Sequence, residues 1–168
     1  MIPRTAEYAL RVAIWLAKQP GIQPSSAIAR ATRVPRRYLF KVLHALYRAG
    51  LLETRTGSRG GYKLRLAPDR ITVLDVVNAV SPIPRIQRCP LGLGSAGRLC
   101  PLHRELDQAA AVVEKAFASV TLAHLAYRKD GSAPLCERAA VSRPRRTGKL
   151  SHPQPRQRAS AYPKRPRR

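Results

Sequence analysis

The chain has 168 residues and carries 32 Lys and Arg against 9 Asp and Glu, a formal net charge of +23. Its length allows one domain, or one domain with an appendage. So large a positive charge predicts a polyanionic partner, of which nucleic acid is the first to consider. No apolar run approaches the roughly 20 residues of a membrane helix. Arg4, Glu7 and Arg11 also interrupt any signal-peptide core, so we expect a cytoplasmic protein.

The first part of the chain predicts a helix-turn-helix with a supporting helix behind it. Apolar residues at helical spacing predict the supporting helix over Thr5–Gln19, with Thr5 as its cap. The first helix of the motif begins at Pro24-Ser25, where Ser25 is the expected cap. A three-residue turn, 32–34, leads into the second helix. This spacing is typical of motifs whose second helix enters a DNA major groove.

The second helix of the motif separates an apolar face from a cationic one. Pro35 and Gly50 bound it, because proline is tolerated at the first helical position and glycine stops a helix. At about 100° per residue, one face carries Leu39, Leu43 and Leu46. The opposite side carries Arg37, Lys41, His44 and Arg48. On an isolated helix such a stripe is usually only the solvated face, but the preceding helix and turn favour a DNA-binding role.

Beyond this helix the apolar period falls to about two residues, which predicts a β-hairpin. The expected strands are Leu51–Thr56 and Tyr62–Leu66, joined by a glycine-rich turn that exposes Arg59 at its tip. Such a wing suits a minor groove or the flanking phosphates, and the alternative is a hairpin whose charges only keep it soluble. The predicted fold is mainly α with a small β-hairpin wing, a winged helix-turn-helix. The residues expected to contact DNA are Ser25, Arg33, Arg36, Arg37, Tyr38, Lys41, His44, Arg48, Arg59, Gly60 and Lys63.

The rest of the chain predicts a short helix, a loop, a long helix and a tail. Thr72 and Asp75 resemble a capping box that opens a helix ending at Val80. The long helix has apolar residues at close to 3.5-residue spacing, which suits a partner helix. These residues are Leu106, Ala110, Val113, Phe117 and Val120. We therefore expect a homodimer formed through the helix from His103 to Val120, although packing onto its own domain would use the same pattern.

The expected organisation is a DNA-binding domain at 1–80, a candidate sensor loop at 81–100, the dimerisation helix with a short terminal helix at 101–129, and a tail at 130–168. The tail holds 11 basic residues, 2 acidic residues and 6 prolines, with almost nothing to build a core. It is predicted to be disordered. A basic tail of this kind would add salt-sensitive affinity for nucleic acid without recognising sequence.

Several of these segments resemble a known family. Glu7-Tyr8-Ala9-Leu10, the wing sequence Arg59-Gly60-Gly61-Tyr62-Lys63-Leu64, and Ile71-Thr72 with Asp75-Val76 are similar to the Rrf-two family of bacterial winged-helix transcription regulators. The resemblance covers about residues 1–127. It implies a sequence-specific bacterial regulator that forms homodimers and binds near-palindromic promoter sites in double-stranded DNA. Several members of the family hold an iron-sulfur cluster through three cysteines in the loop before the dimer helix, and sense iron-sulfur status, nitric oxide or iron.

The loop of this chain departs from that pattern. It has Cys89 and Cys100, and Cys100-Pro-Leu-His103 resembles the last cysteine and the Cys-x-x-His of cluster-assembly regulators, but the middle cysteine is missing. Glu7 aligns with a carboxylate that supplies a ligand from the other subunit in nitric-oxide-sensing members. The resemblance thus implies a ligand set of Cys89, Cys100, His103 and Glu7 in a dimer. Thiolates favour clusters most strongly, and only two are present.

Four alternatives therefore stay open for the loop. They are an iron-sulfur cluster, zinc or another single metal, a thiol or disulfide switch, and cysteines with no ligand. Cys136, in the tail, has no assigned role. For the whole chain, the alternative to a regulator is an architectural or RNA-binding basic protein without a sensing function. An enzyme is not expected, because the sequence shows no glycine-rich phosphate cradle after a strand, no paired carboxylates and no nucleophile motif.

Overall fold

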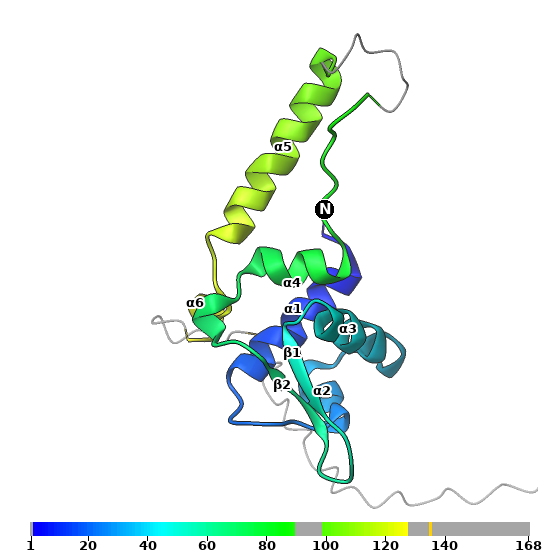
Figure 1. Cartoon of the computed structure of the whole chain (residues 1–168), viewed down its shortest axis with the longest axis vertical. Helices are drawn as coiled ribbons and strands as arrows, with labels where there is room; N and C mark the ends of the chain where they lie inside the picture. Colours follow the sequence, from blue (N-terminus) through cyan, green and yellow to red (C-terminus); the bar gives the residue numbers. More distant parts are fainter. Residues whose placement is uncertain (1, 90–98, 128–134, 136–168) are drawn as a thin grey trace, which may run out of the picture. The chain divides into compact units, whose positions relative to one another are not determined.

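A computed structural model of the chain describes residues 2–89, 99–127 and Leu135. The chain divides into two units, 1–137 and 138–168, and the second lies outside the described residues. Within the described part, six α-helices and a short 3-10 helix accompany a two-stranded antiparallel sheet (Figure 1). This is the mainly α fold with a hairpin wing that the sequence predicts. Among these residues no helix is long and apolar enough to cross a membrane.

Helix α1 (Arg4–Ala17) forms the centre of the core and contacts α2, α3, α4 and α6. Small and branched side chains, spaced three or four residues apart, let these neighbours approach closely. The buried residues of α1 are Ala6, Ala9, Val12, Ala13, Ile14, Leu16 and Ala17. The expectation that Thr5 caps this helix is wrong. The carbonyl of Pro3 already accepts the amides of Ala6 and Glu7, so the helix begins before Thr5.

Helices α2 (Ser25–Thr32) and α3 (Arg36–Arg48) form the helix-turn-helix. Ser25 is not a cap, because Pro24 occupies the capping position and its carbonyl starts the helical ladder. Pro35 likewise caps α3 from outside instead of forming its first turn. The turn is therefore 33–35, one residue later than predicted. Arg33 adopts left-handed backbone angles, with φ of 55°, and ends α2.

Gly50 ends α3 as the sequence predicts. Its φ of +75° lies in the left-handed region that favours glycine. The Gly50 amide donates to the carbonyl of Tyr47 at 2.9 Å, and the Leu51 amide donates to that of Leu46 at 3.0 Å. This paired pattern closes the helix and buries Leu51 directly after the turn. It also directs the chain into the wing.

The wing consists of β1 (Leu52–Arg55) and β2 (Gly61–Leu64), which are shorter than the predicted strands. Tyr62 also exchanges backbone hydrogen bonds of 2.8 and 2.9 Å with Gln23, so the wing is tied to the segment before α2. A side chain at Gly61 would collide with the carbonyl of Gln23. Glycine is required there for close approach, whereas Gly57, with φ of +101°, supplies the positive φ of the turn.

The 3-10 helix η1 (Pro68–Arg70) leads into α4 (Val73–Val80). The predicted capping box is present: the Asp75 amide donates to Thr72 Oγ1 at 3.1 Å, and the Thr72 amide donates to Asp75 Oδ2 at 2.8 Å. Helices α5 (Pro101–Ala118) and α6 (Leu122–Ala126) follow. The Leu122 amide donates to the carbonyl of Ile71 at 2.8 Å, which fastens α6 beside the start of α4.

The long C-terminal helix begins and ends earlier than the predicted range from His103 to Val120. Helix α5 begins at Pro101, because proline suits a first helical position, and it ends at Ala118. Val120 lies beyond α5, where its carbonyl accepts the amide of Val73 at 2.8 Å. The predicted tail at 130–168 lies outside the described residues except for Leu135, which packs against the main core.

Candidate DNA-binding face and candidate sensor segment

Helix α3 presents the predicted division between an apolar and a cationic face. Its buried side chains are Leu39, Val42, Leu43 and Leu46, each at most 2 % exposed. Its basic side chains are all exposed: Arg36, Arg37, Lys41, His44 and Arg48. Within the described residues none of these basic groups forms an ion pair. They are therefore free to meet an anionic partner, which is the arrangement that a DNA-recognition helix requires.

Tyr38 has a different environment from its neighbours on α3. Its ring is half-buried, and its centroid lies 5.6 Å from that of Tyr8 on α1. The Arg37 guanidinium lies over the same ring, 4.9 Å from the centroid. This cation–π contact orients the guanidinium of Arg37. Tyr38, predicted from the sequence as a DNA contact, thus holds a neighbouring cation in place.

The remaining predicted contacts of the helix-turn-helix lie around α2. Ser25 is half-buried in the first turn of α2, and Arg33 is exposed in the turn before α3. Arg11 donates to the carbonyl of Thr32 at 3.2 Å and so supports the C-terminal end of α2. The two predicted contacts therefore bracket α2 at its opposite ends.

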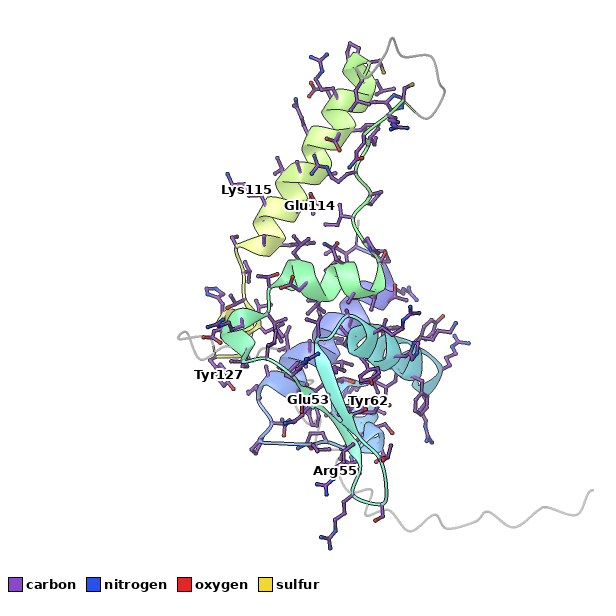
Figure 2. All side chains as sticks on the ribbon, viewed as in Figure 1. Glu53, Arg55, Tyr62, Glu114, Lys115 and Tyr127 are labelled. Carbon is purple, nitrogen blue, oxygen red and sulfur yellow. The ribbon has the colours of Figure 1, made fainter. Side chains whose placement is uncertain are left out.

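The wing carries three cations in unequal environments. Arg59 is exposed in the turn, which is closed by a 2.9 Å hydrogen bond from the Gly60 amide to the carbonyl of Gly57. Lys63 pairs with Glu53 across the strands at 2.9 Å, so part of its charge is neutralised. Arg55, labelled in Figure 2, lies opposite Gly61 and forms no ion pair among the described residues.

Arg55 is absent from the contacts predicted from the sequence. The signal that would have identified it is the strand register. Once Glu53 is paired with Lys63, the residue two positions along faces the same side opposite a glycine, which has no side chain to neutralise it. Arg55 and Arg59 are thus the cations of the wing that are available to an anion.

The predicted sensor residues are only partly brought together. Cys100 is the N-cap residue of α5, and its Sγ lies 3.2 Å from Nδ1 of His103 in the first turn; both side chains are half-buried. Glu7 is exposed and pairs with Arg11 at 3.7 Å. Cys89 is half-buried, and Cys136 lies outside the described residues. Among the described residues of one chain, no three His, Cys, Asp or Glu side chains form a metal-binding group.

The donor set therefore consists of one thiol beside one imidazole. A structural zinc site takes four ligands, and iron-sulfur clusters are usually held by four thiolates. The described residues of a single chain do not fit either group. Either group would require further donors from outside these residues.

The segment before Cys89 is fastened to α5 by an ion-pair network. Arg85 Nε and Nη2 donate to the carboxylate of Asp107 at 2.7 and 2.8 Å, and Nη1 donates to Glu114 at 2.7 Å. The Ile86 amide also donates to Asp107, at 2.9 Å. The Arg85 guanidinium, followed by this amide, lowers the pKa of Asp107 to about 2. The same carboxylates raise the pKa of Arg85.

Helix α5 exposes much of its predicted seam. Phe117 packs against the cluster of Val73 and Val77, whereas Leu106 is 50 % exposed and Val113 is 42 % exposed. An apolar groove of about 630 Å³ runs between α5, α4 and the segment 81–84. Figure 2 shows side chains projecting along the length of α5, and no residue of this helix is buried in the single chain.

A helix-turn-helix with free cations on its second helix, followed by an arginine-tipped hairpin, defines a winged helix-turn-helix DNA-binding protein. The sequence model of the Rrf2 (Rrf-two) family, described as an iron-dependent transcriptional regulator, matches residues 2–128. The chain belongs to the Rrf2 family.

Similar proteins agree with this assignment. A candidate HTH-type regulator of Synechocystis sp., slr0846, is 34 % identical over 128 residues, which cover 73 % of this chain and 84 % of that protein. The regulator NsrR of Shouchella clausii is 34 % identical over 85 residues, or 49 % of this chain and 57 % of that protein.

Solved structures give the same result. CymR of B. subtilis, the global cysteine regulator, aligns with a TM-score of 0.61 and 29 % identity over 75 % of this chain and 95 % of that chain. T. potens IscR has a TM-score of 0.62 over 83 % of this chain and 93 % of its own, and its 20 % identity shows the fold alone. The chain is therefore a DNA-binding transcriptional regulator and not an enzyme.

Proposed function

We propose that this protein is a homodimeric, sequence-specific regulator that inserts α3 into the major groove of a near-palindromic promoter site. The observation that carries the proposal is the division of α3 into a leucine face buried in the core and a basic face that forms no ion pair with any described residue. Burial fixes the direction of the helix, so its cations are presented to DNA as a rigid set. Arg55 and Arg59 of the wing would then contact the flanking phosphates or minor groove. Because promoter DNA lies in the bacterial cytoplasm, the proposed activity would take place there.

The exposed seam of α5 supports the homodimer. Leu106 and Val113 lie on a helix that has no fully buried residue in the single chain, beside an apolar groove. Exposed apolar surface of this kind marks an interaction site, and a second copy would cover it with the same surface. A dimer would also present two copies of α3 to two half-sites. DNA affinity and dimerisation are thus linked.

We infer that the Cys100–His103 pair, together with Cys89, forms the sensing element. The 3.2 Å contact places a thiol beside an imidazole at the start of the dimer helix, where oxidation or a ligand shared between subunits would act on α5. The Arg85 network fastens the segment leading to Cys89 to the same helix. Any change at the cysteines would therefore be transmitted to the joint between α4 and α5.

In vitro selection from random duplex DNA tests the main proposal. We expect the purified protein to enrich an inverted repeat, and the selected duplex to bind one dimer by mass measurement. Enrichment of a single half-site would overturn the homodimer. Enrichment of no sequence would favour the architectural alternative, in which the winged helix only docks and affinity is electrostatic.

A further inference from the structure

A large apolar side chain lies at the edge of the basic face of α3. Phe40 is 51 % exposed, although phenylalanine is usually buried. It is the fifth residue of α3, in the half of the helix that a helix-turn-helix presents to base edges. At about 100° per residue, Phe40 lies about 60° around the helix from Arg37 and about 40° from His44. Phe40 also lies about 60° from the buried Leu43, so it stands at the border of the basic face, with its ring half exposed beside side chains assigned to DNA.

A phenyl ring can recognise only one feature of the major groove. The edges of adenine, guanine and cytosine present hydrogen-bonding groups there, which an apolar ring would leave unpaired. Thymine alone presents a methyl group, and phenylalanine is among the side chains that contact it. A ring held beside Arg37 and His44 would therefore favour thymine and disfavour cytosine, which carries hydrogen at the same carbon.

We propose that Phe40 is a specificity-determining residue that selects thymine through its 5-methyl group, once in each half-site. This inference rests on the proposed insertion of α3 into the major groove. The neighbouring cations contribute affinity by charge and hydrogen bonding, whereas Phe40 contributes discrimination by apolar contact.

Tyr47 provides a matched control on the same helix. It is 50 % exposed and lies two turns after Phe40, about 20° away around the helix axis. Its position in the last turn of α3 places it beyond the residues that reach base edges. The two aromatics are thus equal in exposure and differ in their distance from the start of the helix.

The test replaces single thymines of the selected operator with deoxyuridine, which lacks only the 5-methyl group. Each half-site should have one thymine position at which a single deoxyuridine weakens binding of the parent protein about fourfold, since burying one methyl-sized group is worth about 0.8 kcal/mol. Phe40→Ala should bind the thymine and uracil operators equally. Phe40→Leu should keep the preference because it keeps an apolar contact, and Tyr47→Ala should behave like the parent. Melting temperatures of all variants should match the parent, because both sites are exposed.

The outcomes separate this inference from the proposed function. If deoxyuridine weakens binding of Phe40→Ala as much as it weakens binding of the parent, the proposed thymine contact is wrong. The same holds if Phe40→Ala loses affinity equally for the thymine and the uracil operators. If Arg37→Ala also leaves operator binding unchanged, the insertion of α3 has failed and the Phe40 inference falls with it.

Discussion

The DNA-binding region and helix α5 differ in how well their apolar side chains are buried within a single chain. The basic face of α3 is backed by residues that are at most 2 % exposed, and the wing is hydrogen-bonded to the segment before α2. Helix α5, in contrast, buries no residue, and its cysteine segment gathers one thiol and one imidazole. The recognition surface is therefore a property of the folded chain, whereas the proposed dimer needs a second copy, and the described residues hold only part of the proposed sensing element. Four sets of substitutions test this difference, from the largest expected effect to the smallest.

Replacement of Leu43 with alanine should have the largest effect. Leu43 is fully buried on the core-facing side of α3, so its truncation removes apolar contacts and leaves a cavity. We expect the free energy of unfolding to fall by about 2–5 kcal/mol, with loss of operator binding. Chemical denaturation measures the first and a titration with operator the second. A stability change below about 1 kcal/mol would mean that α3 is not anchored through this face.

Replacement of Leu106 and Val113 with aspartate should act at the other end. Both side chains are exposed in the single chain, so the fold should persist, while two buried charges would prevent association. We expect a folded monomer by light scattering and a loss of affinity for the inverted repeat. Gln108→Asp is the matched control, because Gln108 is exposed and lies outside both the predicted seam and the lining of the groove. A double variant that remains dimeric would place the interface elsewhere.

The cations of the wing should differ in how much each contributes to the salt dependence of operator binding. Arg59→Ala and Arg55→Ala should each reduce the slope of log affinity against log salt by about one, which corresponds to the loss of one phosphate contact. Lys63→Ala should reduce it less, because Lys63 already pairs with Glu53. Measurement of operator affinity across a salt series gives all three slopes. Equal slopes for Lys63 and Arg59 variants would show that DNA displaces Glu53.

The Arg85 network should give a small effect that depends on pH. The pKa of Asp107 is lowered from 3.8 to about 2 in the folded state. This lowering contributes stability that is present above the unfolded pKa and is lost as the pH falls through the folded value. Between about pH 4 and pH 2, the parent should therefore lose stability more steeply than Asp107→Asn. Urea unfolding at stepped pH measures this difference, and parallel curves for the two proteins would exclude the network as its source.

The same contrast explains what the sequence could predict. Helical spacing, Gly50, the Thr72–Asp75 box and the alternation in the wing are local signals, and each placed its element within a few residues. The predicted caps were two residues late at Thr5 and one residue late at Ser25, because Pro3 and Pro24 already supplied carbonyls to the helices. Local patterns identify elements better than they identify terminal residues.

Contacts between distant segments had no local signal. Arg85 pairs with Asp107 and Glu114, which are 22 and 29 residues away in the sequence, and no pattern in the neighbouring sequence predicts this pairing. Phe117 could equally have faced its own domain or a second copy, and only the packing of α4 decides for the former. No role was predicted for Phe40, because at helical spacing it lies between the apolar and cationic faces, and its exposure is visible only once α3 is packed.

The most direct test of sequence-specific binding through α3 is the ratio of affinities for the selected operator and for random duplex at about 150 mM salt. For the parent we expect a ratio on the order of a thousand or more, because base contacts persist where nonspecific attraction is screened. For a protein carrying Arg37→Ala and Lys41→Ala the ratio should fall at least tenfold, with the melting temperature unchanged. An equal ratio for both proteins would show that α3 does not recognise the operator.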